Sequence, residues 1–302
     1  MLDIAVQLNF KALEFGCGNW SPAKHLNLDE LLENKDKRLY FLDAIQSRGL
    51  KIEALNCSGN QLAPNDEGAV HQAVVEKTFR LAEHLGVTKI VMMSGLPGGG
   101  PGEKLPNWIT TSWPMRNLDV LEWQWNDVAI PYWQKTVERA KSYGITKIAL
   151  ENHGFQLVYN AATLKKLRDN AGELVGMNLD PSHLFWMGGD PVSAIMDLGQ
   201  AIYHVHAKDA RIESYFSNIN GLLDTQAIDK YKTRAWNYVA VGYGHDLLWW
   251  KTFCSRLLMA GYDGALSLEM EDQSMGQVEG VKKSVEVLIK SMPGFDDLME
   301  KI

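Results

Sequence analysis

The chain has 302 residues, of which 46% are hydrophobic and 22% are charged, a balance typical of an ordinary globular protein. This composition excludes a disordered tail protein, a collagen-like repeat and a disulfide-rich miniprotein. A net charge of −7 creates no overall field that would attract nucleic acid or an anionic membrane, and the apolar runs are shorter than the ~20 residues of a membrane helix.

Seven strand-like runs recur along the chain, each followed by a stretch with helical spacing. In chain order they are KALEF (11–15), KIEALNC (51–57), KIVMMS (89–94), KIALEN (147–152), VGMNLD (175–180), YHVHAK (203–208) and ALSLEME (265–271). Alternating strands and helices predict a parallel sheet with helices outside it. No G-x-G-x-x-G follows the first run, so we favour a TIM (β/α)8-type barrel over an open doubly wound sheet.

Several helix starts are marked by residues that cap helices. Asn27 can cap a helix that runs to about Arg48 and ends at Gly49, and Asn160 can cap the segment ATLKKLRDN. Asp190 followed by Pro191 is typical of an N-cap with proline in the first helical position.

The barrel is expected to lack its first strand, because seven runs are present and eight are needed. The opening MLDIAVQLNF has apolar residues at helical spacing (Leu2, Ile4, Ala5 and Leu8) and leads directly into KALEF. That order is helix then strand, as if a first strand were missing through truncation. The two open edges would cost stability and favour association, which leaves a homo-oligomer possible, although the sequence does not define the oligomeric state.

We expect one domain over residues 1–302, with long loops at 94–131 and 209–246. The first loop contains Gly98–Gly100 and four of the ten tryptophans. Its LPGGGPGEKL lacks the G-K-[ST] ending of a phosphate loop. Flat aromatic faces pack well on sugar rings, so Trp113 is a candidate substrate contact. A tryptophan-rich subunit interface is the alternative for this cluster.

Three cysteines, Cys17, Cys57 and Cys254, lack the spacing of a disulfide framework or a metal motif. We interpret them as reduced thiols. No basic-then-apolar leader opens the chain. Both observations predict a cytoplasmic protein.

Four ionisable residues lie near the ends of four successive runs: Glu151, Asp180, His206 and Glu269. Three carboxylates and an imidazole at one barrel mouth would repel one another unless a cation lay between them. Oxygen ligands with one nitrogen suit Mn²⁺ best, with Mg²⁺, Co²⁺ or Zn²⁺ also allowed. Any one of these residues alone could equally form an ordinary salt bridge; the common register of the set is what predicts one divalent metal ion.

Other polar residues near these positions are candidates for contact with substrate. His153 has the same strand parity as Glu151, and a helix-capping role is its alternative. His183, three residues after Asp180, could be a base, a substrate ligand or a partner of a ligand. Arg211 and Lys208 could bind sugar hydroxyls or form salt bridges at the rim, and Asn56 could bind a hydroxyl or belong to a turn.

The motifs ALENHG, NLDPSHLFW, HVHAKDAR and ALSLEMED resemble the signature strands of the sugar phosphate isomerase/epimerase family, the xylose isomerase-like barrels. The resemblance covers most of the chain. It implies that Glu151, Asp180, His206 and Glu269 hold one divalent ion. In the ketose 3-epimerases of this family the first and last ligand glutamates also move the proton, and these correspond to Glu151 and Glu269.

The predicted activity is therefore a metal-dependent isomerase or epimerase of a sugar or keto-sugar, acting through an enediolate. A lyase on a keto-sugar, inosose dehydratase-like or C-glycoside deglycosidase-like, is the alternative, since it shares the first proton transfer. An endonuclease IV-like DNA repair enzyme is disfavoured because the early strands end in Cys17, Asn19, Asn56 and Ser58 rather than histidines. A non-catalytic sugar-binding barrel is disfavoured because all four ligand positions are present.

Overall fold

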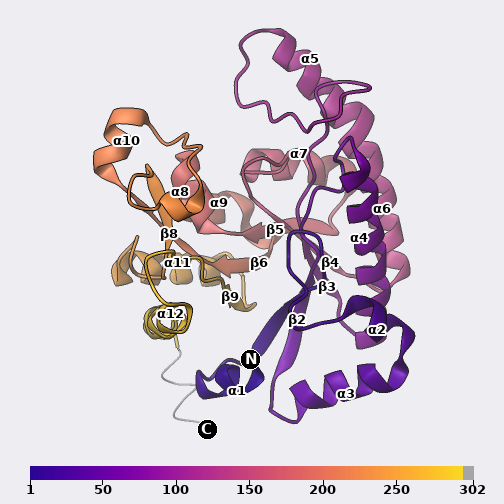
Figure 1. The fold of residues 1–302 in the computed structure, drawn as a ribbon, viewed down its shortest axis with the longest axis vertical. Coiled ribbons are helices and arrows are strands. Elements are labelled where there is room, and N and C mark those ends of the chain that lie inside the picture. The colour runs from indigo at the N-terminus through magenta and orange to yellow at the C-terminus, as the bar shows by residue number, and fades with distance from the viewer. Residues whose placement is uncertain (295–302) are drawn as a thin grey trace. The chain divides into compact units, whose positions relative to one another are not determined.

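The computed structural model describes residues 1–294 as two compact units, one ending at Asn178 and the other beginning at Leu179 (Figure 1). None of the helices in residues 1–294 combines the length and apolar character that a membrane span requires.

The first unit contains parallel strands and the helices that connect them. Its strands are β1 (Ala12–Gly16), β2 (Lys51–Asn56), β3 (Lys89–Met92), β4 (Lys147–Glu151) and β5 (Val175–Leu179), the last of which ends at the boundary. Its helices are α1 (Leu2–Gln7), α2 (Leu28–Glu33), α3 (Lys35–Gln46), α4 (Asp66–Leu85), α5 (Arg116–Trp123), the π-helix η1 (Gln124–Ala129), α6 (Ile130–Ser142) and α7 (Ala161–Ala171).

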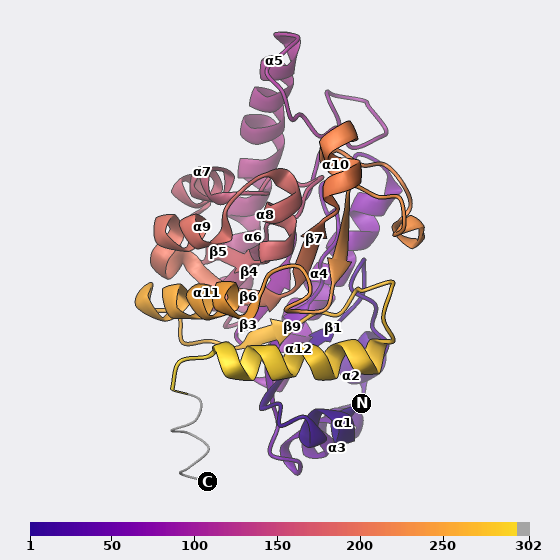
Figure 2. The same ribbon diagram turned by 90° about the vertical axis from the view of Figure 1, so that its left-hand side faces the viewer.

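The second unit contains two parallel strands, a hairpin and the remaining helices. Its strands are β6 (Ile202–Ala207), β7 (Asp209–Ile212), β8 (Trp236–Val239) and β9 (Leu266–Leu268). Its helices are α8 (Pro181–Met187), α9 (Pro191–Leu198), α10 (Ser214–Asn220), α11 (Leu247–Met259), α12 (Gln277–Ser291) and the short 3₁₀ turns η2 (Gly199–Ala201) and η3 (Ile228–Lys230). Helix α12 packs along α11 and β9 (Figure 2).

All seven predicted strands are present and parallel, which confirms the barrel-type fold class. Side chains on both faces of the inner strands are buried: Ile148, Ala149 and Leu150 of β4 are all inaccessible to solvent. Burial on both faces explains why these runs are continuously apolar rather than alternating. Their carboxyl ends carry the polar residues described below.

The chain opens on helix α1 and then enters β1, as its apolar spacing predicts. Among the described strands, β1 has β2 as its one hydrogen-bonded neighbour and β9 has β6. Each therefore has an open edge, which agrees with a barrel that lacks its first strand. No paired strand precedes Asp3 in residues 1–294.

Helix boundaries follow the predicted caps with one exception. Asn160 caps α7 in a capping box, and the Asp190 side chain accepts from the backbone N–H groups of Val192 and Ser193 at the start of α9. The helix expected from Asn27 to Arg48 is instead two helices, because Asn34 leaves helical geometry and its side chain caps α3. The asparagine side chain accepts hydrogen bonds from backbone N–H groups, which ends the first helix and starts a second one.

The two segments expected to be long loops both contain regular structure. Residues 94–131 include α5, η1 and the start of α6, and residues 209–246 include β7, α10, η3 and β8. The pairing of β7 with β8 is antiparallel and places Arg211 opposite Asn237. The parallel strands alternate with helices along the sequence. Strand β7 instead follows β6 directly, and β8 follows the short turn η3, so the strand–helix alternation predicts neither of them.

Candidate metal centre

Three of the predicted ligands meet in the second unit, just after the carboxyl ends of their strands. Asp180 follows β5, His206 lies near the end of β6, and Glu269 follows β9. A carboxylate oxygen from each acidic residue and a ring nitrogen of His206 lie within 4.8 Å of one another. Asp180 and His206 are fully buried, and the Nδ1 of His206 lies 3.4 Å from Oε1 of Glu269.

Asp180 is held by the start of helix α8. Its Oδ1 accepts hydrogen bonds from the backbone N–H of Ser182 at 2.9 Å and from the Ser182 hydroxyl at 2.7 Å. Its Oδ2 lies 3.0 Å from Nζ of Lys208 and 3.3 Å from Nε2 of His183. The sequence Asp-Pro-Ser thus folds so that one carboxylate oxygen caps the helix while the other faces the cluster.

Lys208 supplies the positive charge within this group of carboxylates. Its ammonium is 2.8 Å from Oε2 of Glu269 and 3.9 Å from Oε1 of Glu271, and the residue is almost fully buried. Burial by itself would raise the pKa of Asp180, but the charge of Lys208 and the hydrogen bond from His183 outweigh burial and hold that pKa well below its usual range. The cluster therefore contains an ionised Asp180.

Glu271 shares the same strand parity as Glu269 and faces the same ammonium. Burial, together with the charges of Glu269 and Asp180, raises the pKa of Glu271 above its ordinary value, although Lys208 opposes the rise.

His183 is fully buried and is surrounded by polar and aromatic groups. Its Nε2 faces Asp180, while its Nδ1 lies 3.1 Å from the Tyr238 hydroxyl and 3.4 Å from the indole nitrogen of Trp186. The structure therefore places His183 as a direct neighbour of a predicted ligand.

Glu151 and His153 lie in the first unit, at and just beyond the end of β4. Glu151 is the last residue of that strand, is almost fully buried, and pairs in register with Asn178 of β5. His153 follows two residues later, and its Nδ1 contacts the carbonyl oxygen of Gly154. Because that oxygen only accepts, Nδ1 carries the proton of this contact.

Asn56, at the end of β2, is part of a hydrogen-bonded chain. Its Nδ2 donates to Oε1 of Glu14 at 2.6 Å, and its Oδ1 accepts from the Ser21 hydroxyl at 2.6 Å and from the Ser58 backbone at 2.8 Å. The amide therefore orients Glu14, in the middle of the neighbouring strand β1.

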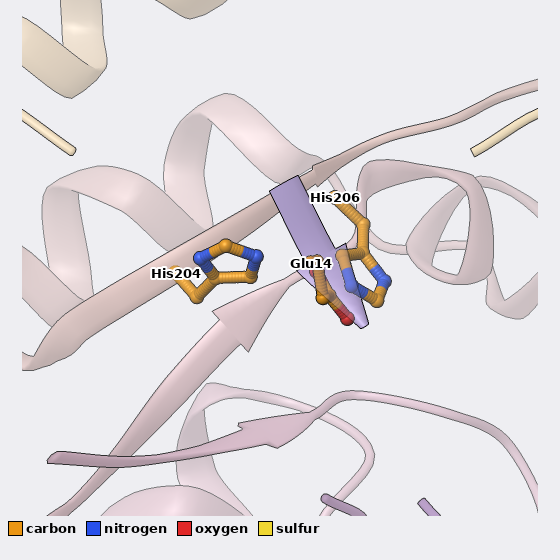
Figure 3. A group of neighbouring side chains, drawn as sticks. All are labelled: Glu14, His204 and His206. Atoms are coloured by element: carbon orange, nitrogen blue, oxygen red, sulfur yellow. The ribbon is translucent and has the colours of Figure 1, made fainter. Parts of the chain in front are cut away.

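His204 and His206 point to the same side of β6, as their spacing of two predicts. Their rings meet edge to face with centroids 5.6 Å apart (Figure 3). Both residues are fully buried.

Two predicted substrate contacts lie elsewhere within their units. Arg211, on β7, donates twice to Oε1 of Glu213, at 2.9 and 2.7 Å, and this carboxylate also accepts from Asn237. Trp113 lies in the 94–131 segment and is 73% exposed. By contrast, Trp125 of the same segment is buried, as is Trp133 just beyond it.

Three residues beside the cluster were not among the predicted site residues: Trp186, Tyr238 and Glu271. Strand parity with Glu269 is a signal that could have identified Glu271. Tyr238 has no such signal, because it lies 55 residues from His183 along the chain and on a hairpin that the pattern does not reveal.

Comparison with known proteins places these features in a family. The model of the xylose isomerase-like TIM barrel family matches residues 2–291. The uncharacterized protein YfiH of Bacillus subtilis (strain 168) is 55% identical over 290 residues, covering 95% of this chain and 93% of that protein.

Solved structures with the same fold include a D-tagatose 3-epimerase-like protein, with a TM-score of 0.62, 19% identity and coverage of 97% of this chain and 91% of that one. The IOLI protein with a bound zinc atom has a TM-score of 0.64, 18% identity and coverage of 97% and 93%. At these identities the likeness shows the fold. With the family model matching nearly the whole length, the chain belongs to the xylose isomerase-like TIM barrel family.

Proposed function

We propose that this chain is a metal-dependent isomerase or epimerase of a sugar or keto-sugar. The observation that carries the proposal is the convergence of Asp180, His206 and Glu269, whose ligand atoms lie within 4.8 Å of one another at strand ends of the second unit. In barrels of this type, catalytic residues come from the carboxyl ends of several strands.

The donor set fits a divalent ion. Two carboxylates and one imidazole are already close together, and Glu151 is the natural fourth ligand: it ends β4 opposite Asn178, and Asp180 follows Asn178 by two residues on the same side of the strand. Mostly oxygen donors with one nitrogen suit Mn²⁺, with Mg²⁺, Co²⁺ or Zn²⁺ as alternatives. When bound, such an ion supplies Lewis-acid polarisation of a carbonyl and the hydroxyl beside it.

The residues of the chain would then position the substrate and move its proton. Glu151 or Glu269 removes the proton next to the carbonyl, and the other glutamate returns a proton on the opposite face or at the neighbouring carbon. His153 and Lys208 contact substrate oxygens. We assign Asn56, Arg211 and Trp113 to further contacts with substrate, whereas His183, whose two ring nitrogens face groups of the protein, is assigned to the support of Asp180 rather than to substrate.

The D-tagatose 3-epimerase-like structure supports the epimerase reading at the level of fold, and the zinc atom in the IOLI structure supports a metal on this scaffold. The substrate is accordingly a small carbohydrate.

Incubation with Mn²⁺ and a panel of keto-sugars in D₂O tests the proposal by NMR. We expect deuterium to enter next to the carbonyl and an isomer of the starting sugar to form, with no loss of water. Asp180→Asn should abolish exchange, whereas Asp263→Asn, outside the cluster, should leave it unchanged. Full exchange by protein freed of metal with EDTA would contradict the metal-dependent mechanism.

A lyase acting on a keto-sugar is the second candidate, and the β7–β8 hairpin favours it. This hairpin brings the Tyr238 hydroxyl to His183 and places the Tyr238 ring 4.9 Å from the Lys208 ammonium. In such an elimination Glu151 or Glu269 would remove the C–H proton and a C=C bond would form. An acid at the position of Tyr238 would protonate the β-hydroxyl, which departs as water. In the same NMR experiment, loss of water or of an aglycone identifies a lyase.

We also propose that the protein acts in the cytoplasm. All three cysteines, Cys17, Cys57 and Cys254, are free and buried, and burial raises the pKa of the Cys57 and Cys254 thiols to about 12. Unpaired thiols are typical of a reducing compartment.

A further inference from the structure

Two polar groups converge on one nitrogen of His183. The indole Nε1 of Trp186 donates to Nδ1 at 3.4 Å, and the Tyr238 hydroxyl lies 3.1 Å from the same atom. An indole N–H can only donate, so Nδ1 must be an acceptor that carries no proton. The proton of the neutral ring is therefore on Nε2.

The Nε2 atom of His183 faces Asp180. It lies 3.3 Å from Oδ2 of that carboxylate, while Oδ1 accepts two hydrogen bonds from Ser182. Asp180 is thus held from both sides, by the helix start on one oxygen and by His183 on the other.

The two groups on Nδ1 are themselves fixed by packing. Trp186 stacks on Trp236, with ring centroids 5.1 Å apart and an interplanar angle of 7°. The Tyr238 ring meets Trp236 at 5.1 Å and contacts the Lys208 ammonium at 4.9 Å. Because these rings pack against one another, the Trp186 indole and the Tyr238 hydroxyl approach Nδ1 of His183 from fixed positions.

We infer that Trp186 and Tyr238 are positioning residues, which hold His183 as an Nε2–H donor to Asp180 and thereby orient Asp180 for a divalent ion. This inference rests on the proposed metal-dependent function. Partners that orient a metal ligand in this way change metal affinity or activity about 10- to 100-fold when removed. The inference also gives the β7–β8 hairpin a role in building the site.

The test combines a spectroscopic and a binding measurement on the full-length protein. Long-range ¹H–¹⁵N spectra of ¹⁵N-histidine-labelled protein with Mg²⁺ report the tautomer of His183, whose signals are assigned by their loss in His183→Gln. Mn²⁺ affinity is measured by EPR of the free ion. Tyr238→Phe keeps the ring and removes the hydroxyl, and Trp186→Phe removes the indole N–H. Tyr215→Phe, a 73% exposed tyrosine of the same 209–246 connection, is the matched control.

We expect Nδ1 of His183 to be unprotonated in the unchanged protein and its resonance to move downfield in Tyr238→Phe and Trp186→Phe. Mn²⁺ affinity should fall about 10-fold in each variant, with neither change in Tyr215→Phe. A proton on Nδ1, or unchanged spectra and affinity in both variants, would overturn the inference. Failure of the unchanged protein to bind Mn²⁺ would instead contradict the proposed function, so the two failures are distinguishable.

Discussion

The contact between His153 and Gly154 in the first unit shows which ring nitrogen of His153 carries a proton. Its Nδ1 donates to the Gly154 carbonyl, and the ring is proposed to contact substrate. The same geometry would also suit a purely local role, in which the ring only shapes the turn after β4. Kinetics of a single variant separates the two.

For His153→Ala we expect kcat to fall by about 100-fold, the usual size of a general acid–base contribution, while Mn²⁺ binding stays near normal. Metal titration and steady-state kinetics of the same sample measure both. His25→Ala, in the loop before α2, serves as the control and should change neither. A parallel loss of bound metal and activity would assign His153 to the metal site itself.

Glu53 illustrates an ion pair that acts on stability rather than on the site. Burial alone would raise its pKa, but hydrogen bonds and attraction from Lys89 and Lys51 outweigh burial and lower it. The Glu53 carboxylate lies 2.7 Å from Nζ of Lys89, and both side chains are largely buried. Because the folded pKa is depressed, the pair stabilises the fold above the unfolded pKa, and this contribution is lost as pH falls through the folded value.

Glu53→Gln should therefore lower the free energy of unfolding at pH 7 by on the order of 1 kcal/mol, and the difference should shrink toward zero in acid. Urea unfolding across this pH range measures it. Glu138→Gln, which removes an exposed partner of Lys141 on α6, should have little effect at any pH. A constant difference for Glu53→Gln across the pH range would show that its charge is not what matters.

At the scale of elements, one buried carboxylate organises the end of the hairpin. Oδ2 of Asp209 accepts hydrogen bonds from the backbone N–H groups of Gly242, Gly244 and His245, at 3.0, 3.1 and 3.0 Å. Its Oδ1 lies 2.8 Å from Nδ1 of His245. A fully buried carboxylate with this many donors is satisfied, and it fixes the turn between β8 and α11.

Gly244 allows the turn to come this close. A Cβ at this position would lie 2.4 Å from the backbone oxygen of Ala210 and 2.6 Å from Oδ1 of Asp209. Gly244→Ala should therefore destabilise the protein by about 1–3 kcal/mol, as overpacking does, measured by thermal unfolding. At Gly100 a Cβ would meet nothing within 4 Å, so Gly100→Ala should be nearly neutral. Equal effects of the two would contradict a steric requirement at Gly244.

The 94–131 segment is anchored at its base and exposed further along. The Ser94 hydroxyl accepts from Val158 of the turn after β4 at 2.8 Å, and the Ser94 carbonyl accepts from the Trp133 indole at 3.0 Å. Exposed apolar side chains follow, Leu105, Trp113 and Met115 among them. We therefore predict that these exposed side chains contact substrate or another molecule rather than contribute to the core.

Trp113→Ala should accordingly change KM or oligomer size more than the unfolding temperature, because Trp113 is 73% exposed. Kinetics, light scattering and thermal unfolding measure the three quantities. Trp133→Phe, in the core, should show the opposite pattern. An effect of Trp113→Ala confined to the unfolding temperature would exclude both contact roles.

At the scale of the whole molecule, metal binding should be linked to folding. The carboxylates of Asp180 and Glu269 are brought together only in the folded chain, so an ion that binds there stabilises the native state alone. At a free Mn²⁺ concentration of 100 Kd the gain is about 2.7 kcal/mol.

We therefore expect Mn²⁺ to raise the unfolding temperature in a concentration-dependent way and EDTA to reverse the rise. Asp180→Asn should remove the dependence, whereas Asp263→Asn should retain it. The same rise in Asp180→Asn would show that Mn²⁺ binds elsewhere. Differential scanning calorimetry with a metal titration provides the measurement.

The sequence by itself determined the seven parallel strands, the opening helix and most helix caps, because periodicity and capping are local properties of the chain. It also predicted that Asp180, His206 and Glu269 would meet, since carboxyl ends of parallel strands share one edge. Only the tertiary structure decided which groups surround them. The Lys208 ammonium lies between two carboxylates, and Tyr238 reaches His183 across 55 residues of chain. Such contacts depend on where a hairpin folds back, and no local pattern encodes that.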